Sequence, residues 1–497
     1  MFPFDFTIGL GTKRLKGLKI PFTDKVGLFG GVELSLNPRI NLMAEYNPID
    51  YEKDKRSARG VPEGAKYPVD IGMRAKILPG INMGLSYQRG DTLGIMLHVQ
   101  TELGKPILPQ RANPPPQVEV DKRPFEKRDL RKMVKEIYRA IHDEGFSDVS
   151  VYTDGENLIA EFSNTRYLSY QKAAGRVLRI LLLHAPSDAK KLTAIVKQKA
   201  LPILPDPTKL KAFFSGDRGF SYRPGIKPEF QTYLNDPSGF FKFRVGMKPY
   251  AVADLWKGAQ GYARYDIPFY SNIRSSNVPV PGAVASDSWK YMGRSFSFDR
   301  LMIDQTLRLS KRVFGRLSFG YFESMFAGAG GEVLGFFGDG NIALGLESDL
   351  VRKREPKTQF NLTDLRAHTL LASGYYRSPG LGTTLEVQYG RFLAGDVGWL
   401  LTLSREYDTG VIIGAWYSKT STENLTEYNR GYNDKGVFLS LPARIFLTHD
   451  STERYYYALR PWTRDVAAKV YHWQSLFDMA SDLMPAVFRS RISDLKR

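Results

Sequence analysis

Paired carboxylates are the first candidates for chemistry in this chain, and Glu386 with Asp396 is one such pair. Glycoside hydrolases use two carboxyl groups, one as a general acid and the other as a base or nucleophile. The sequence gives no separation between these two carboxylates, and charged residues of this kind also line the interior of a β-barrel. Both interpretations therefore stay open for the pair.

Other familiar catalytic patterns do not occur. The chain has no G-x-x-x-x-G-K-[ST] phosphate loop, no H-E-x-x-H zinc motif and no convincing G-x-S-x-G elbow. The Gly-rich run at 336–340 lies between β patterns rather than before a helix, which favours a turn over a nucleotide site. We therefore expect a protein that is not an enzyme.

Metal and thiol chemistry has little support in the composition. The chain has no cysteine, which excludes disulfides, cysteine-bound zinc, iron–sulfur clusters and thiol nucleophiles. No two of the six histidines are close enough in sequence to suggest a pair of metal ligands; they are His98, His142, His184, His368, His449 and His472. We expect no metal and no cofactor.

The charge of the chain points to an anionic partner. Its 497 residues include 70 Lys and Arg against 52 Asp and Glu, a net charge of +18. Such a chain is attracted to nucleic acid, acidic polysaccharide or lipid phosphates, and charge alone does not choose among them. No run of 18 apolar residues occurs, so a membrane-spanning helix is not expected. The first residues show no signal peptide, so we expect a cytoplasmic chain or one whose start has been removed.

Short alternating segments fill residues 1–104. Apolar and polar or small residues alternate at period two in 40–46 and 81–87, which indicates strands with one apolar face. About six strands are expected, the low end for a barrel that closes alone. We therefore expect this region to be part of a first barrel whose upstream strands are missing.

The pattern changes at a Pro-rich linker, 105–120, and then describes a small α/β insert at 121–203. Apolar residues have helical spacing in 128–143, and Gly145 is the expected stop. Two strand candidates follow around the turn at Asp154 and Gly155, and a second helix is expected through 170–183. The insert thus reads as helix, hairpin and helix.

A second β region covers 204–473 and ends in a basic, helical tail at 474–497. It holds about twelve to fourteen strand candidates of about ten residues, the length that a tilted strand needs to cross hydrocarbon. Aromatic residues gather at segment ends, as at Tyr375 and Trp399, where a barrel places its interfacial girdles. Charged residues lie in the strand middles, as at Arg308 and Glu347, which favours a polar lumen over a sandwich face. The fold class expected is mostly β, with two fused transmembrane antiparallel β-barrels and the α/β insert between them.

Several blocks of the carboxy-terminal half resemble the YjbH family of exopolysaccharide- and capsule-associated outer-membrane proteins, which includes the WbfB and GfcD relatives. The blocks are 213–270, GRFLAGDVG at 390–398, SREY at 404–407, NDKG at 433–436 and RPWTRD at 460–465.

The resemblance implies a Gram-negative outer-membrane protein with two fused barrels and a periplasmic domain, exported by a signal peptide and often lipid-anchored. It also implies a role in making or secreting an extracellular polysaccharide. This sequence departs from the pattern because it shows no signal peptide and no lipobox cysteine. Lipid anchoring is therefore not carried over.

The resembling blocks contain the candidate glycan or lumen contacts. An Arg side chain offers a planar fork to a carboxylate or phosphate, and Tyr offers a ring face and a polar tip to a sugar. The alternative is that Arg–Asp pairs fix strand register or plug the lumen. The candidates are Asp217, Arg218, Tyr222, Arg223, Arg391, Asp396, Arg464 and Asp465.

The sequence thus predicts an outer-membrane barrel that acts in exopolysaccharide or capsule secretion as a conduit or an assembly partner. Its expected partners are outer-membrane lipid and lipopolysaccharide, an acidic polysaccharide and other secretion proteins. A soluble or periplasmic β-rich carbohydrate-binding protein is the alternative. Nucleic-acid binding is not expected, because the basic residues are dispersed over the strands instead of being gathered with aromatic residues in one module.

Overall fold

A computed structural model gives the fold as two compact units, residues 1–109 and 110–497. The described residues are 3–12, 26–46, 67–78, 80–100, 102, 105–109, 111, 121–197, 211–215, 221–236, 239–274, 281–294, 296–459 and 464–496. The candidates Asp217 and Arg218 lie outside them, as does most of the Pro-rich linker. None of the helices in these ranges is long and apolar enough to cross a membrane.

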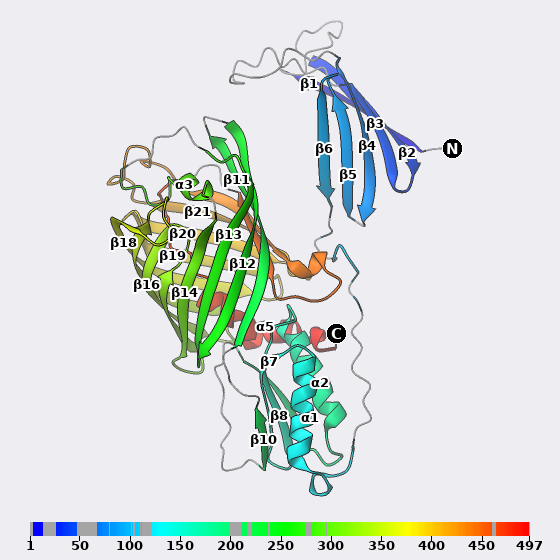
Figure 1. Ribbon diagram of the computed structural model, residues 1–497, viewed down its shortest axis with the longest axis vertical. Helices are drawn as coiled ribbons and strands as arrows, with labels where there is room; N and C mark the ends of the chain where they lie inside the picture. Colours follow the sequence, from blue (N-terminus) through cyan, green and yellow to red (C-terminus); the bar gives the residue numbers. More distant parts are fainter. Residues whose placement is uncertain are drawn as a thin grey trace. The chain divides into compact units, whose positions relative to one another are not determined.

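The first unit is a six-stranded antiparallel meander in chain order (Figure 1). Its strands are β1 (Phe4–Thr12), β2 (Val26–Asn37), β3 (Ile40–Tyr46), β4 (Val69–Leu78), β5 (Ile81–Gln88) and β6 (Thr92–Val99). Large apolar side chains such as Ile8 and Leu93 are exposed on it. In the described residues β1 and β6 are the two edges of this sheet and do not pair. The structure thus supplies strands of the expected kind here, and a closed first barrel is not confirmed.

The α/β insert opens the second unit. Its helices are α1 (Leu130–Asp143) and α2 (Tyr170–His184), preceded by the turn η2 (Phe125–Lys127). The side chain of Asp129 caps α1 by accepting from the backbone N–H groups of Arg131 and Lys132. Ser169 caps α2 in the same way through the N–H of Lys172. The predicted helices and hairpin are therefore present, with polar caps at both helix starts.

Two strands that the sequence pattern did not reveal complete the insert's sheet, which has the order β10-β7-β8-β9. The predicted hairpin is β7 (Ser147–Thr153) with β8 (Asn157–Ser163), and the added strands are β9 (Lys191–Lys197) and β10 (Ala212–Ser215). The two strands β8 and β9 are parallel, joined through α2. Apolar residues of both helices, including Val134, Ile137 and Val177, are fully buried against this sheet.

The main body is a thirteen-stranded antiparallel sheet, β11 to β23 in chain order, that curls into a nearly closed barrel (Figure 1). The strands are β11 (Ser221–Asp236), β12 (Gly239–Trp256), β13 (Ala259–Ser271), β14 (Ser297–Arg308), β15 (Val313–Tyr321), β16 (Phe326–Phe337), β17 (Ile342–Arg354), β18 (Leu362–Ser378), β19 (Thr383–Arg391), β20 (Val397–Glu406), β21 (Ile412–Thr420), β22 (Lys435–Pro442) and β23 (Arg454–Leu459). The Gly-rich run at 336–340 ends β16 and forms the turn before β17, as expected.

The first and last strands of this sheet meet through side chains. The ring of Phe230 stacks on Tyr457 at 6.0 Å, and the Thr232 hydroxyl lies 2.7 Å from the Tyr457 hydroxyl. An odd number of antiparallel strands makes β11 and β23 run in the same direction, and the described residues show no backbone ladder between them. We call this side-chain contact the seam.

Burial on the large sheet is the inverse of that in a soluble protein. On β17, Leu344, Leu346 and Leu350 are 53–67% exposed on the outer face, whereas Asp349 on the inner face is 2% exposed. Three arginines, Arg244, Arg316 and Arg354, are among the most completely buried large side chains. Charged residues therefore gather inside the barrel and apolar residues outside.

The short helices of the second unit lie at the ends and in the interior of the barrel. They are α3 (Trp289–Met292), η4 (Ala443–Phe446), α4 (Leu476–Ala480), η5 (Ser481–Leu483), α5 (Pro485–Ser490) and η6 (Ile492–Lys496).

Candidate functional site

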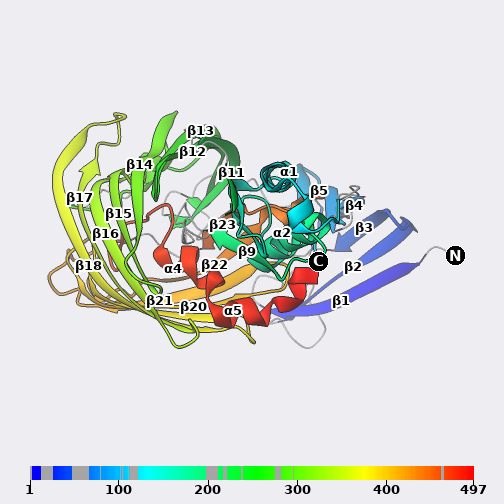
Figure 2. The same cartoon turned by 90° about the horizontal axis from the view of Figure 1, so that it is seen from below.

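The last part of the chain, residues 464–496, is here called the C-terminal segment. Its residues up to Met484 pack inside the barrel, whereas α5 and η6 lie at the rim near the insert, where Leu495 meets Gly175 of α2. Trp473 stacks on Tyr262 of β13 at 4.4 Å, and Phe477 of α4 stacks on Tyr375 of β18 at 4.1 Å. Val470 belongs to a buried apolar cluster with residues of the barrel wall. Seen from below, α4 lies within the outline of the sheet (Figure 2). The segment therefore packs as a core inside a barrel whose wall is otherwise polar.

Polar contacts fix the same segment to the wall. The Lys469 ammonium donates to the Gln388 amide oxygen at 2.8 Å. The Arg377 guanidinium donates to Asp482 at 2.6 Å and to the Ser481 hydroxyl at 2.9 Å. Both wall residues are inward-facing, since both are buried. The segment is thus held by matched polar groups as well as by apolar packing.

The rest of the wall carries ion pairs that bridge neighbouring strands. The Arg244 guanidinium lies 2.9 Å from Glu229 and 2.8 Å from Asp266. Lys248 bridges Glu229 at 2.7 Å and Asp299 at 3.2 Å. A buried charge is tolerated only when it is paired. These networks explain how so many charges fit inside the barrel.

One group of interior residues has the ligand types of a metal site. His472 Nε2 lies 2.8 Å from Asp349 and 3.4 Å from Glu347, and the three candidate ligand atoms lie within 4.8 Å of one another. A positively charged side chain of the protein already pairs with one of these carboxylates, because the Arg316 guanidinium lies 3.4 Å from Glu347. Sequence reasoning missed this group because His472 and Asp349 are 123 positions apart.

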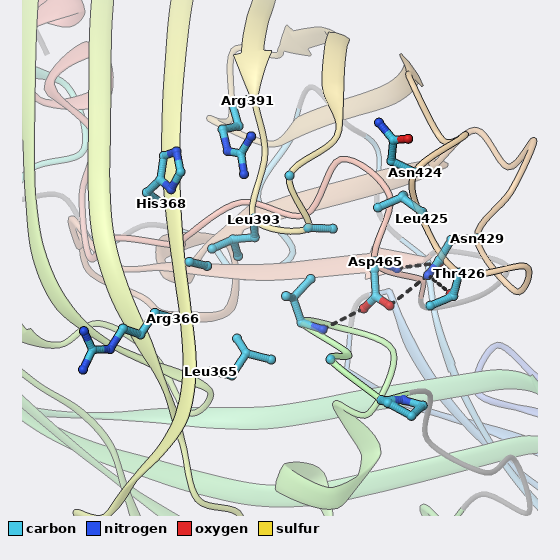
Figure 3. Close-up of a pocket in the computed structure, with 16 residues that line it drawn as sticks. Leu365, Arg366, His368, Arg391, Leu393, Asn424, Leu425, Thr426, Asn429 and Asp465 are labelled. Atoms are coloured by element: carbon cyan, nitrogen blue, oxygen red, sulfur yellow. Dashed lines mark hydrogen bonds between the residues drawn. The ribbon is translucent and has the colours of Figure 1, made fainter.

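A pocket of about 350 Å³ opens at one end of the barrel, and we call it the mouth pocket (Figure 3). The start of β18, the turn after β19 and the loops at 281–287 and 424–429 line it. These strand ends lie at the rim opposite the α/β insert, which contacts the other rim through Leu168 and Asp450. Of the sequence candidates, Arg391 and Asp465 line the pocket.

Asp465 connects three segments at the mouth through hydrogen bonds: its own segment, the loop at 281–287 and the loop at 424–429. Its Oδ1 accepts the backbone N–H groups of Val284, Ala285 and Ser286 at 2.7–3.0 Å. Its Oδ2 accepts from the Ser286 hydroxyl at 3.1 Å and from the Asn429 amide at 3.0 Å. Five donors surround one buried carboxylate, so its charge is compensated within the chain.

Two further candidates also hold the chain in place. The Arg464 guanidinium lies 4.5 Å from the ring centres of both Tyr428 and Tyr432, and it donates to the Tyr428 carbonyl oxygen. Asp396 Oδ2 accepts the backbone N–H of Ala467 at 2.9 Å. Burial raises the pKa of the Asp396 carboxyl. Arg464, Asp465 and Asp396 together fix the start of the C-terminal segment at the mouth.

Arg391 differs from these residues. It is exposed at the end of β19, and its guanidinium has no hydrogen bond or ion pair within the described part of the chain. Figure 3 shows it beside His368 of the neighbouring strand and above Leu393, while Arg366 points away from the pocket. The pocket therefore contains an arginine that is not neutralised by any carboxylate in the part of the chain that the structure describes.

The remaining candidates lie at the opposite rim. Tyr222 is 64% exposed near the start of β11, and Arg223 pairs with Asp254 at 2.7 Å. In the register of β11 with β12, both face the end of β12 that is far from the mouth. The structure thus brings together Arg391, Asp396, Arg464 and Asp465 but not the β11 pair.

The sequence did not point to His368, Asn424 or Thr426, which also line the pocket. These residues come together only because the sheet curls and brings the ends of different strands to one rim. Neither the residue types nor their spacing in the sequence predicts this arrangement. In the sequence, only the blocks 390–398 and 460–465 indicated candidate residues that the structure places at this rim.

Comparisons with known proteins identify the family of the chain. The family model described as "Exopolysaccharide biosynthesis protein YbjH" matches residues 16–214 and 203–482. A relative described as "Uncharacterized lipoprotein YjbH", from Escherichia coli (strain K12), is 23% identical over 560 residues, which cover 97% of this chain and 78% of that protein. The resemblance noted in the sequence is confirmed, and the chain belongs to the YjbH family of exopolysaccharide biosynthesis proteins.

Proposed function

We propose that the thirteen-stranded sheet spans the outer membrane of a Gram-negative cell and takes part, without catalysis of its own, in the export of an exopolysaccharide. The α/β insert then faces the periplasm and the mouth pocket faces outward. The family carries the link to exopolysaccharide, and the relative is a lipoprotein, which supports association with a membrane.

The inverted burial of the sheet is the observation that supports this proposal most directly. Outward side chains such as Leu317, Phe319 and Leu403 are 58–70% exposed. Each large apolar side chain left in water forgoes roughly 1.5–3 kcal/mol of transfer free energy, a loss that lipid contact removes. Monomeric soluble proteins rarely expose continuous apolar surface on this scale. Alternation of apolar outward and polar inward residues is the pattern of membrane barrels.

The filled interior bears on the choice between conduit and assembly partner. The C-terminal segment packs against the wall at several levels, from Ala467 near the mouth to Met484 near the other rim. We infer that this segment obstructs the passage of a polymer chain while it is in place. We therefore propose that the barrel rests in a closed state and works with lipopolysaccharide, the polymer and other secretion proteins at the membrane.

Site-directed spin labelling tests the membrane proposal, and the absence of cysteine makes single labels possible without other changes. Leu346→Cys and Leu401→Cys place labels on the outer face of β17 and β20, and Glu423→Cys places one in an exposed loop as the control. In liposomes, the two strand labels should be accessible to oxygen and protected from a polar nickel reagent, whereas the loop label should show the reverse.

Equal nickel accessibility at all three positions would overturn the membrane proposal. If the protein were also monodisperse without detergent, the soluble carbohydrate-binding alternative would replace it.

A further inference from the structure

The mouth pocket has the chemistry of an anion site. Among its lining residues, Asp465 is the one carboxylate in the described chain, and its two oxygens are already engaged by five donors. Arg391 brings a positive charge that has no hydrogen-bond or ion-pair partner among the described residues, and His368 lies on the adjacent strand. A ligand that carried an acidic group would meet the guanidinium without displacing a protein carboxylate.

The other lining groups are those that recognise sugars. Asn424 and Thr426 offer amide and hydroxyl groups on one side of the pocket, and the partly buried Leu425 offers apolar surface. Small-molecule sites combine an apolar lining with a few placed polar groups in volumes of roughly 300–1,000 Å³. A volume of about 350 Å³ lies at the small end of that range and suits a short piece of a chain rather than a folded partner.

We propose that the mouth pocket binds a carboxylate-bearing sugar unit of the exopolysaccharide, with the Arg391 fork on the carboxylate and Leu425 against the C–H face of the ring. This inference rests on the proposed function for the identity of the polymer and for the outward position of the pocket. It adds a substrate class, an acidic glycan, and a residue that selects it.

Arg391 is the specificity residue in this arrangement because a planar guanidinium can donate two parallel hydrogen bonds to a carboxylate. A neutral sugar would leave that charge unmatched. The pocket should therefore prefer acidic oligosaccharides, and part of the preference should persist at moderate salt, where the attraction due to net charge alone is screened.

The test measures binding of oligogalacturonate and of a neutral glucan oligomer of the same length to the full chain in detergent, by titration calorimetry at moderate salt. Wild type should bind the acidic oligomer and not the neutral one. Arg391→Gln should weaken binding about tenfold, the loss expected for one charge-assisted contact. Arg430→Gln removes an exposed charge on the nearby loop outside the pocket lining and should leave binding unchanged.

The proposal is overturned if Arg391→Gln binds as well as wild type, if Arg430→Gln loses as much as Arg391→Gln, or if both oligomers bind equally. Spin labels at 346 and 401, read in the same preparations, separate this result from the membrane proposal. Lipid-exposed labels with unchanged Arg391→Gln binding would reject the pocket alone, whereas water-exposed labels would reject the membrane barrel itself.

Discussion

Two arginines at the mouth of the barrel have opposite surroundings. Arg464 lies against two tyrosine rings and donates to a backbone carbonyl, so its guanidinium interacts with groups of the same chain. Arg391 has no such contacts in the described chain. Both residues lie in blocks that resemble the family. A motif gives the type and order of residues, but it does not show which guanidinium makes contacts within the folded chain. The sequence alternative was an Arg–Asp pair that fixes strand register or plugs the lumen, whereas the contacts of Arg464 described here are with tyrosines, and ligand binding stays a prediction for both arginines.

Asp396 provides a residue-scale prediction that depends on pH. Burial raises its pKa, so the unfolded chain loses this proton at lower pH than the folded chain does, and stability falls as pH rises through that interval. Asp396→Asn keeps an oxygen to accept from the Ala467 N–H and removes the buried charge. We expect the variant to unfold at a higher temperature than wild type at neutral pH.

The difference should shrink as the pH falls toward the ordinary carboxyl pKa. Heat-induced loss of folded gel mobility over a pH series measures it. Asp364→Asn, at an exposed carboxylate on β18, is the control and should change little. A lower unfolding temperature for Asp396→Asn at neutral pH would contradict the prediction.

At the scale of elements, the contact between α2 and η6 depends on one glycine. A Cβ at Gly175 would lie 2.2 Å from the backbone oxygen of Leu495, which no flexible side chain could relieve. Gly175→Ala gains about 1 kcal/mol of helix propensity but forces η6 away from α2. We expect faster proteolysis of the last residues of the chain, with α2 itself intact.

Limited proteolysis followed by mass spectrometry detects this release. Leu182→Ala changes an exposed position on the same helix and should leave the cleavage rate as in wild type. An unchanged rate for Gly175→Ala would show that η6 is not held by this contact.

We expect His184, at the end of α2, to make the insert sensitive to acid. Burial lowers the pKa of its imidazole, and the charges of Arg128 and Lys122 add to the effect against the opposing Glu136. The unfolded chain therefore takes up a proton first as pH falls below the ordinary value of 6.5, and the insert loses stability in that interval.

Hydrogen exchange of peptides from α1 and α2 in the full chain should accelerate as the pH falls through this interval, after correction for intrinsic rates. His184→Gln should flatten the dependence, and His142→Gln, at an exposed position on α1, should not. A dependence that survives in His184→Gln would assign the sensitivity to another group.

Elements were predictable to the extent that their burial followed a regular period. Helix α1 buries one face, α2 buries an apolar face against the insert's sheet as well as its Gly175 side, and the long strands alternate, so these elements left clear patterns. The bulge beside Arg264, where the β13–β14 register shifts, left none. The sequence also did not predict that the C-terminal segment returns into the barrel. Short helices that pack inside a polar lumen have the same mixed composition as a tail on the protein surface.

For the whole molecule, the filled interior predicts low conductance. Reconstituted full-length chain should stay near background in planar bilayers. Replacing both stacking residues, Trp473→Ala with Phe477→Ala, removes two large contacts that hold the segment in place and should increase the frequency of open events. Arg489→Ala, which breaks an exposed pair with Asp339 at the rim, is the control and should resemble wild type. Steady large conductance in wild type would show that the segment does not close the barrel.

The overall architecture was predictable in part. A mostly β chain with a large barrel-shaped sheet and an α/β insert followed from strand length and alternation. Whether the six strands of the first unit close could not be read from the pattern, since alternation describes each strand and not the partners of the edges. The seam could not be predicted either. Whether the first and last strands run in the same direction depends on whether the number of strands is odd or even, and the strand candidates indicated that number only as about twelve to fourteen.

The C-terminal segment is fastened at both of its ends. Asp465 holds its start to the mouth loops, and Leu495 packs on Gly175 of α2 at the other rim. A chain segment that is fixed at both ends can transmit a pull from one end to the other. We infer that a displacement of the insert would act on the mouth loops through this segment, which gives the two rims of the barrel a mechanical linkage that the strands themselves do not provide.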